Sequence, residues 1–216
     1  IDNLAEAQKV MVNEMGGTLF TIAKDVKLQL EFNPTKVKSY RLIGYENRML
    51  KKEDFNDDTK DAGELGSGHT VTALYEIIPA SSGENMTSNV DPLKYQKVEQ
   101  SSNPDYADEW VTVKFRSKQP DADKSQLIVH AHSGPIAPIE EASINMRFAS
   151  AVAEYGMLLR SSKFKGGSSF DAVIERAQMA KGRDKEGYRK EFILLVRKAH
   201  DLYQVRYPKP IAQGNK

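Results

Sequence analysis

Apolar and polar residues alternate along several stretches of the first two thirds of the chain, and this alternation predicts strands. Every second residue from Val26 to Phe32 is apolar, which is the period of a half-buried strand. Asn33 and Pro34 then signal a turn, so residues 37–46 are predicted to form a hairpin with that strand. Further strands are predicted over residues 69–78, 110–118 and 125–134. Residues 46–68 are predicted to be a polar loop, and residues 80–108 a long loop with a short edge segment near 94–98.

A helical period appears at both ends of the chain. Near the beginning, apolar residues recur on one helical stripe, and Asn3 can cap a helix that continues to about Lys24. Gly16 and Gly17 weaken this helix, and a break at the pair is the alternative. After Gly134 the period changes to 3.6 and predicts three helices. Their predicted starting signals include Ser168 and Asp184, and Gly182 ends the second helix. The face predicted to point inward on the third helix consists of Tyr188, Phe192, Leu195, Val196, Ala199 and Leu202.

Strands followed by helices predict an α+β fold. We expect an antiparallel sheet or sandwich of about five or more strands over residues 26–134, followed by about three helices over residues 135–207. The 216 residues suffice for one large domain or two small ones.

Composition and charge exclude several classes of function. Lys and Arg number 31 and Asp and Glu number 30, without long runs of one sign, so binding to nucleic acid is not expected. The absence of cysteine excludes disulfides, thiolate metal ligands and cysteine nucleophiles. No apolar run approaches the ~20 residues of a membrane span. The chain begins at Ile1, and we expect it to be a fragment of a longer protein, from which a signal or anchor has been removed.

Two stretches have the residue types of metal sites. His130 and His132 are two residues apart on one predicted strand, so they share a face and can supply two zinc ligands. The alternative is a solvent-facing surface, with Leu127, Val129 and Ala131 on the other face. The acidic residues 54–64 resemble a calcium loop, but Thr59 and Leu65 stand where an EF-hand needs Gly and Glu. An irregular calcium loop and a solvated turn both remain open, and the turn is favoured.

The remaining polar motifs have structural interpretations. Gly66 and Gly68 precede His69, and we interpret this histidine as the first residue of a strand rather than a reactive group. Glu140 and Glu141 are expected at a helix start, where the helix dipole favours negative charge. The KGGSS stretch at 165–169 lacks the spacing of a phosphate loop. We therefore expect no catalytic, cofactor-binding or metal-binding residues, and no enzymatic activity.

Three stretches carry a resemblance to a known family: GTLFTIAKDVKLQLEFNP, YRLIGYENRMLKKEDFNDDTKDAGELGSGHTVTALYEIIP and MRFASAVAEYGMLLR. Across nearly its whole length the chain resembles the C-terminal part of bacterial YfbK-like proteins, which carry a von Willebrand factor type A domain. The resemblance implies that residues 1–25 are the last helix of that type A domain. It also implies an envelope location, often with a lipid anchor. The Asp-x-Ser-x-Ser metal motif of type A domains does not occur in this chain.

The expected function is therefore that of a non-enzymatic interaction or structural-support module that follows a type A domain. Its expected partners are that domain and a protein of the bacterial envelope, with loop 80–108 as a recognition segment. The alternative is a metal-binding or metal-dependent hydrolase domain that uses His130, His132 and acidic residues of the 54–64 loop.

Overall fold

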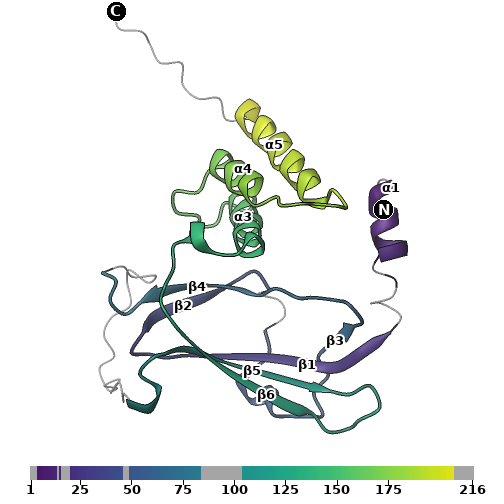
Figure 1. Cartoon of the computed structure of the whole chain (residues 1–216), viewed down its shortest axis with the longest axis vertical. Helices are drawn as coiled ribbons and strands as arrows, with labels where there is room; N and C mark the ends of the chain where they lie inside the picture. Colours follow the sequence, from purple (N-terminus) through teal and green to yellow (C-terminus); the bar gives the residue numbers. More distant parts are fainter. Residues whose placement is uncertain (1–3, 14, 16–19, 46–48, 84–103, 207–216) are drawn as a thin grey trace, which may run out of the picture. The chain divides into compact units, whose positions relative to one another are not determined.

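The computed structural model describes the chain apart from residues 1–3, 14, 16–19, 46–48, 84–103 and 207–216 (Figure 1). The strands are β1 (Thr21–Phe32), β2 (Val37–Ile43), β3 (Gly63–Gly66), β4 (Leu74–Pro79), β5 (Glu109–Lys118) and β6 (Gln126–Ser133). The principal helices are α1 (Leu4–Gln8), α3 (Ile144–Leu159), α4 (Phe170–Met179) and α5 (Tyr188–Arg206). Strands thus precede three C-terminal helices, which confirms the predicted α+β fold. The chain divides into a sheet unit, residues 1–135, and a helical unit, residues 136–216.

The strands of the sheet unit form two antiparallel sheets. One has the order β3-β1-β5-β6, and the other consists of β2 and β4. The predicted hairpin between residues 26–32 and 37–46 is wrong, because β2 pairs with β4 instead of β1. Asn33 explains the change: its backbone N–H donates to the Trp110 carbonyl at 3.0 Å, and its side-chain amide donates to the Glu109 carbonyl at 2.8 Å. These bonds hold the start of β5 beside β1, in the place that a hairpin partner would occupy.

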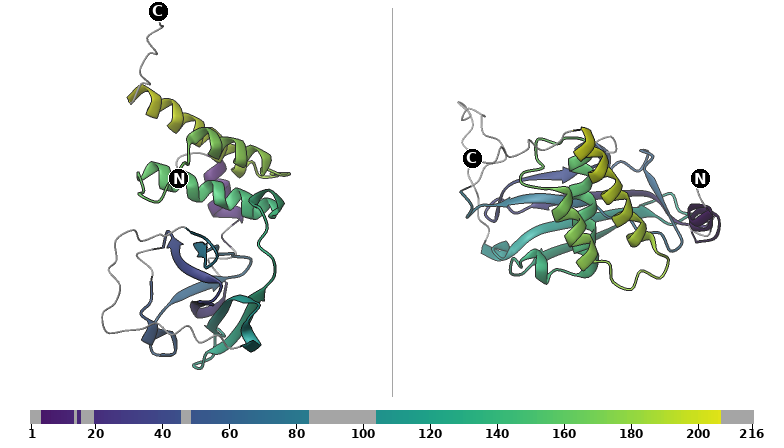
Figure 2. Two further views of the ribbon diagram at one scale, coloured as in Figure 1. Left: turned by 90° about the vertical axis from the view of Figure 1, so that its left-hand side faces the viewer. Right: turned by 90° about the horizontal axis from the view of Figure 1, so that it is seen from above.

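The two sheets are stacked (Figure 2). Aromatic rings of both sheets contact one another. The ring of Phe32 in β1 lies 4.3 Å from that of Tyr40 in β2 and 5.6 Å from that of Tyr75 in β4, measured between centroids. We call the side of the four-stranded sheet that carries Phe32 its inner face, and the side that carries Lys27 its outer face. Strand register places Val111 and His132 level with Phe32, and Arg116 and Leu127 level with Lys27.

The predicted N-terminal helix ends earlier than expected. α1 covers Leu4–Gln8 and is followed by a π-helical turn over Lys9–Asn13, while β1 already begins at Thr21. A helix that extends to Lys24 is therefore wrong, and the alternative break at Gly16 and Gly17 falls on residues outside the described part. β-branched residues at 21 and 22 and pairing with β3 and β5 favour the strand.

The segment around His69 also differs from its prediction. β3 occupies Gly63–Gly66, within the predicted loop, and pairs with β1. Gly68 has a φ of +75° and makes the turn after β3, where the His69 N–H donates to the Gly66 carbonyl. The next strand, β4, begins only at Leu74, so His69 does not begin a strand. The predicted edge segment near 94–98 lies outside the described residues.

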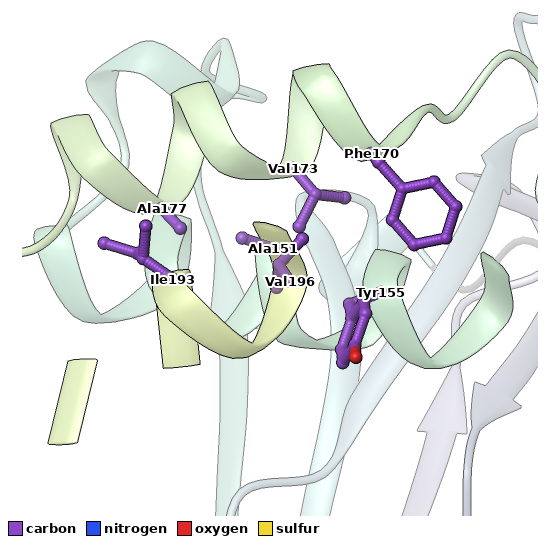
Figure 3. Packing of buried hydrophobic residues seen from close by; sticks show 7 residues of the cluster. All are labelled: Ala151, Tyr155, Phe170, Val173, Ala177, Ile193 and Val196. Atoms are coloured by element: carbon purple, nitrogen blue, oxygen red, sulfur yellow. The ribbon is translucent and has the colours of Figure 1, made fainter. Parts of the chain in front are cut away.

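The helical unit has a closed apolar core (Figure 3). The core consists of Ala151, Tyr155, Phe170, Val173, Ala177, Ile193 and Val196, with Phe148, Leu158, Ile174, Phe192 and Ala199 packed around it.

Side-chain oxygens cap the helices of this unit. The Ser143 hydroxyl accepts from the Met146 N–H at the start of α3. At the start of α4, Ser169 rather than the predicted Ser168 accepts from the Ala172 N–H. Asp184 accepts from the N–H groups of Arg189 and Lys190 at the start of α5.

The face that α5 buries is only partly the predicted one. Val196 is buried, and Phe192 and Ala199 pack against the core, as predicted. Leu195 and Leu202 were also predicted to point inward but are exposed, and Ile193 is buried in addition. The helix carries apolar residues on two faces, and packing against α3 and α4 uses the face that contains Ile193.

Candidate functional site

The acidic segment 54–62 lies against the outer face of the four-stranded sheet. A 3-10 helix, Lys52–Phe55, places the Phe55 ring in a buried position next to the sheet. The guanidinium carbon of Arg116, on β5, lies 5.5 Å from the centre of this ring. Phe55 therefore anchors the segment, and the residues after it follow the outer face.

Lys27 on β1 binds the backbone of this segment. Its side chain projects from the outer face of β1 and is only 2% exposed. The ammonium group donates to the backbone carbonyls of Asp54 at 3.1 Å and Asp57 at 2.5 Å. A buried lysine needs such acceptors, because an ammonium group without them is costly to desolvate.

A second buried lysine, Lys118 on β5, holds the other end of the segment. Its ammonium group donates to the Asp58 carbonyl at 2.7 Å and lies 2.7 Å from Oδ2 of Asp25. Asp25 has a φ of 52° and stands where the β1–β5 register shifts, a bulge that turns its carboxylate toward Lys118. The Lys118 ammonium lowers the pKa of Asp25, and Asp25 in turn raises the pKa of Lys118.

The carboxylates of the segment are also used within the protein. Asp58 accepts a hydrogen bond from the Ser125 hydroxyl at 2.5 Å, and this bond is the largest cause of the lowered pKa of Asp58. Asp57 accepts from the hydroxyl and N–H of Thr59, which lowers its pKa as well. Together with the two lysines, these contacts fix the segment as a turn on the sheet.

The same contacts bear on the predicted calcium loop. A hard cation would take backbone carbonyls and carboxylates as ligands. In this segment the carbonyl oxygens of Asp54, Asp57 and Asp58 accept from Lys27 and Lys118 instead. Internal ammonium groups thus occupy carbonyl oxygens that a calcium loop would offer to its metal ion. The calcium loop and the turn both stay predictions, with the turn favoured.

His130 and His132 lie on the opposite side of the sheet from this segment. Register places His130 level with Val113 and His132 level with Val111, on the inner face with Phe32. The pair therefore shares a face as predicted, but the sheet separates it from the acidic segment, and the two do not form one metal site. Nowhere in the described part of the chain do three His, Asp or Glu side chains come together as a possible metal site.

The prediction that Leu127, Val129 and Ala131 turn away from a solvent-facing histidine side is only half right. Both faces of β6 are exposed, including these three residues. The reason is the position of β6 at the edge of the sheet, where the β2–β4 sheet does not cover it.

The other candidate residues occupy surface turns. His69 is exposed in the segment between β3 and β4. Glu140 and Glu141 are exposed in a short 3-10 helix, Ile139–Glu141, which ends before α3 begins at Ile144.

The site residues that the sequence analysis did not identify are the buried lysines, Lys27 and Lys118. The alternating pattern of a strand does not distinguish a buried lysine from one that faces solvent.

The Asp25–Lys118 pair predicts acid-sensitive stability of the sheet unit. Because folding lowers the pKa of Asp25 below 3.8, its contribution is present above that pH and is lost as the pH falls through the folded-state pKa. We expect the contribution of this pair to the unfolding free energy, measured by urea titration with Trp110 fluorescence, to stay constant from pH 7 to about pH 5 and to fall as the pH drops below about 4. Asp25→Asn should reduce this fall, while the exposed control Asp121→Asn should leave it unchanged. An equal pH dependence in all three proteins would contradict the assignment.

Comparison with known proteins places the chain in a family. Residues 17–202 match the family described as "Uncharacterized protein YfbK, C-terminal". The protein "Uncharacterized protein YfbK" of Escherichia coli (strain K12) is 43% identical over 206 residues, which cover 95% of this chain and 34% of that protein. The chain thus spans about a third of the length of this relative.

No solved structure matches the chain. Among the described helices, none has the length and apolar character needed to cross a membrane. The chain belongs to the family of YfbK C-terminal domains.

Proposed function

We propose that this chain is a non-enzymatic interaction and structural-support module that follows a von Willebrand factor type A domain in a protein of the bacterial envelope. The family membership supports the link to YfbK proteins, and the resemblance noted in the sequence supports the type A domain and the envelope location. The observation that carries the interaction role is the second apolar face of α5, which the helical unit does not use in its own core.

The second apolar face of α5 consists of Leu195, Leu202 and Val205, which we call the stripe. Their side chains are 53%, 71% and 83% exposed, although the helix buries Ile193 and Val196 on its other side. Several exposed apolar side chains on one side of a helix are typical of a docking surface. It is therefore a surface that a binding partner can bury.

The spacing of the stripe favours a helical partner. Leu195 and Leu202 are seven residues apart, and the exposed charged residues Glu191 and Lys198 beside them have the same spacing. Leucines at this interval, bordered by charges of both signs, are the pattern with which helices pair. We propose that α5 docks an amphipathic helix of an envelope partner, with Lys and Glu placed to oppose Glu191 and Lys198.

The test compares Leu202→Glu with a matched control, Met179→Glu, at an exposed apolar position on α4. Each variant, placed in bait that includes the upstream type A domain, is used to capture partners from native envelope extract. We expect Leu202→Glu to reduce capture of a given partner at least about tenfold, because a buried unpaired carboxylate opposes docking. Met179→Glu should retain it. Equal capture by both variants, with unchanged thermal stability, would contradict a role for the stripe.

A shorter bait of the 216 residues alone assigns the recognition. Partner capture by this bait would place the binding surface on these residues. Capture only by the longer bait would make this chain a support for the type A domain. Loop 80–108 remains a predicted recognition segment, and most of it, residues 84–103, lies outside the described part of the chain.

A further inference from the structure

In the described part of the chain, the two sheets of the sheet unit end in four edge strands, and these differ in how they are protected. β3 and β6 are the edges of the four-stranded sheet, and β2 and β4 are each an edge of the small one. An edge strand presents unpaired backbone N–H and C=O groups, which can pair with another chain. Natural proteins block such pairing with charged residues, prolines or very short strands.

Three of the four edges carry this protection. β3 has only four residues and includes Glu64. β2 includes Lys38 and Arg41, and β4 includes Glu76 and ends at Pro79. A strand that paired with any of these edges would lie next to a charge or meet a missing N–H.

β6 has none of these features. Its eight residues, QLIVHAHS, contain no Asp, Glu, Lys, Arg or Pro. Apolar side chains on both of its faces are exposed: Leu127 at 46%, Ile128 at 62% and Val129 at 54%. Lys124 before the strand and Pro135 after it limit any added pairing to the strand itself. β6 is thus a long, uncharged edge whose side chains gain from being covered.

These properties define what fits against β6. An incoming strand should be extended and uncharged, with apolar side chains toward both faces. A second copy of β6 meets each requirement, since it offers the same uncharged sequence and an edge that faces no other described strand. We propose that β6 pairs antiparallel with β6 of a second copy, which continues the four-stranded sheet across a two-fold axis. This inference rests on the edge alone and is independent of the role proposed for α5.

The geometry restricts the register of this pairing. A two-fold axis perpendicular to the sheet keeps the inner face of one copy level with the inner face of the other. With the axis at Val129, that residue faces itself, Leu127 faces Ala131, and Ile128 faces His130. This register places more apolar surface across the axis than one centred on His130, where Leu127 would face Ser133. We therefore assign the axis to Val129.

The first test is the mass of the 216-residue chain in solution. Sedimentation velocity at increasing concentration should show a shift from a 24.2 kDa monomer toward twice that mass. Val129→Glu would place two like charges opposite each other and should weaken dimerisation at least about tenfold. The matched control is Val71→Glu, at an exposed apolar position between β3 and β4, and it should dimerise like the unchanged protein.

The second test uses the natural absence of cysteine. Facing residues of antiparallel strands have Cβ atoms about 4.5–5.5 Å apart, close to disulfide range. Val129→Cys should therefore form a disulfide-linked dimer under mild oxidation, whereas Val71→Cys should not. A monomer at every concentration, with no more disulfide at position 129 than at 71, would overturn the proposal. Dimerisation that Val129→Glu leaves unchanged would overturn it as well, even if α5 binds its partner as proposed.

Discussion

Replacing Phe170 by alanine should lower the unfolding free energy of the helical unit by about 4 kcal/mol. Phe170 is the first residue of α4, and its ring packs against aromatic side chains of α3 and α5. It lies 6.3 Å from the ring of Tyr155 on α3 and 5.5 Å from the ring of His200 on α5, measured between centroids. Because the site joins all three helices, its loss leaves a cavity that no single helix can fill by a small movement.

The measurement is chemical denaturation followed by circular dichroism at 222 nm, which reports mainly on the helices. The matched control is Phe164→Ala, since Phe164 is 38% exposed in the turn between α3 and α4. The control should cost about 1 kcal/mol, because much of that ring already contacts water. A loss below about 1 kcal/mol for Phe170→Ala would show that the three helices do not share this core.

The alternating strands were the most predictable part of the fold. Residues 110–118 and 125–134 were predicted as strands, and β5 and β6 occupy Glu109–Lys118 and Gln126–Ser133. β3 was missed because its four residues, GELG, have no strand pattern of their own, and their conformation depends on pairing with β1. The same limit explains β2, whose partner was decided by the side-chain and backbone bonds of Asn33.

The helical unit shows a different limit of periodicity. Three helices were predicted, and α3, α4 and α5 confirm them. In α5, however, Ile193 and Val196 define one apolar face, and Leu195 and Leu202 define another. A helical period detects that apolar faces exist, but which one is buried depends on the helices packed against it.

The lysines that organise the acidic segment could not be distinguished in the sequence. Lys27 and Gln29 occupy equivalent polar positions in the half-buried strand that the alternation predicts. Asp54, whose carbonyl accepts from Lys27, lies 27 residues further along the chain. The acidic composition suggested a bound cation, and the structure supplies cationic groups from the sheet instead.

The second large effect is expected at Lys27. Lys27→Met keeps much of the aliphatic length of the side chain but removes the ammonium group beneath the acidic segment. The carbonyls of Asp54 and Asp57 then lose their donor at a buried position. We expect the unfolding free energy of the sheet unit to fall by roughly 3 kcal/mol, since buried acceptors without a donor are costly.

Lys114→Met is the matched control for this change. Lys114 also projects from the outer face, two residues from Arg116, but it pairs with the exposed carboxylate of Glu31 at 3.1 Å. Removing a surface ion pair of this kind should cost under about 1 kcal/mol. Denaturation followed by the fluorescence of Trp110, the single tryptophan, reports on the sheet unit in both variants.

The outcome separates two roles for Lys27. If it holds the acidic segment, Lys27→Met should also expose residues 54–58 to faster amide hydrogen exchange, while Lys114→Met should not. If the methionine variant were as stable and as protected as the control, hydrophobic packing of Phe55 against the sheet would be sufficient to place the segment. The Lys27 ammonium group would then fill a position that the fold does not require, and the apolar contact of Phe55 would be the stronger anchor of the segment.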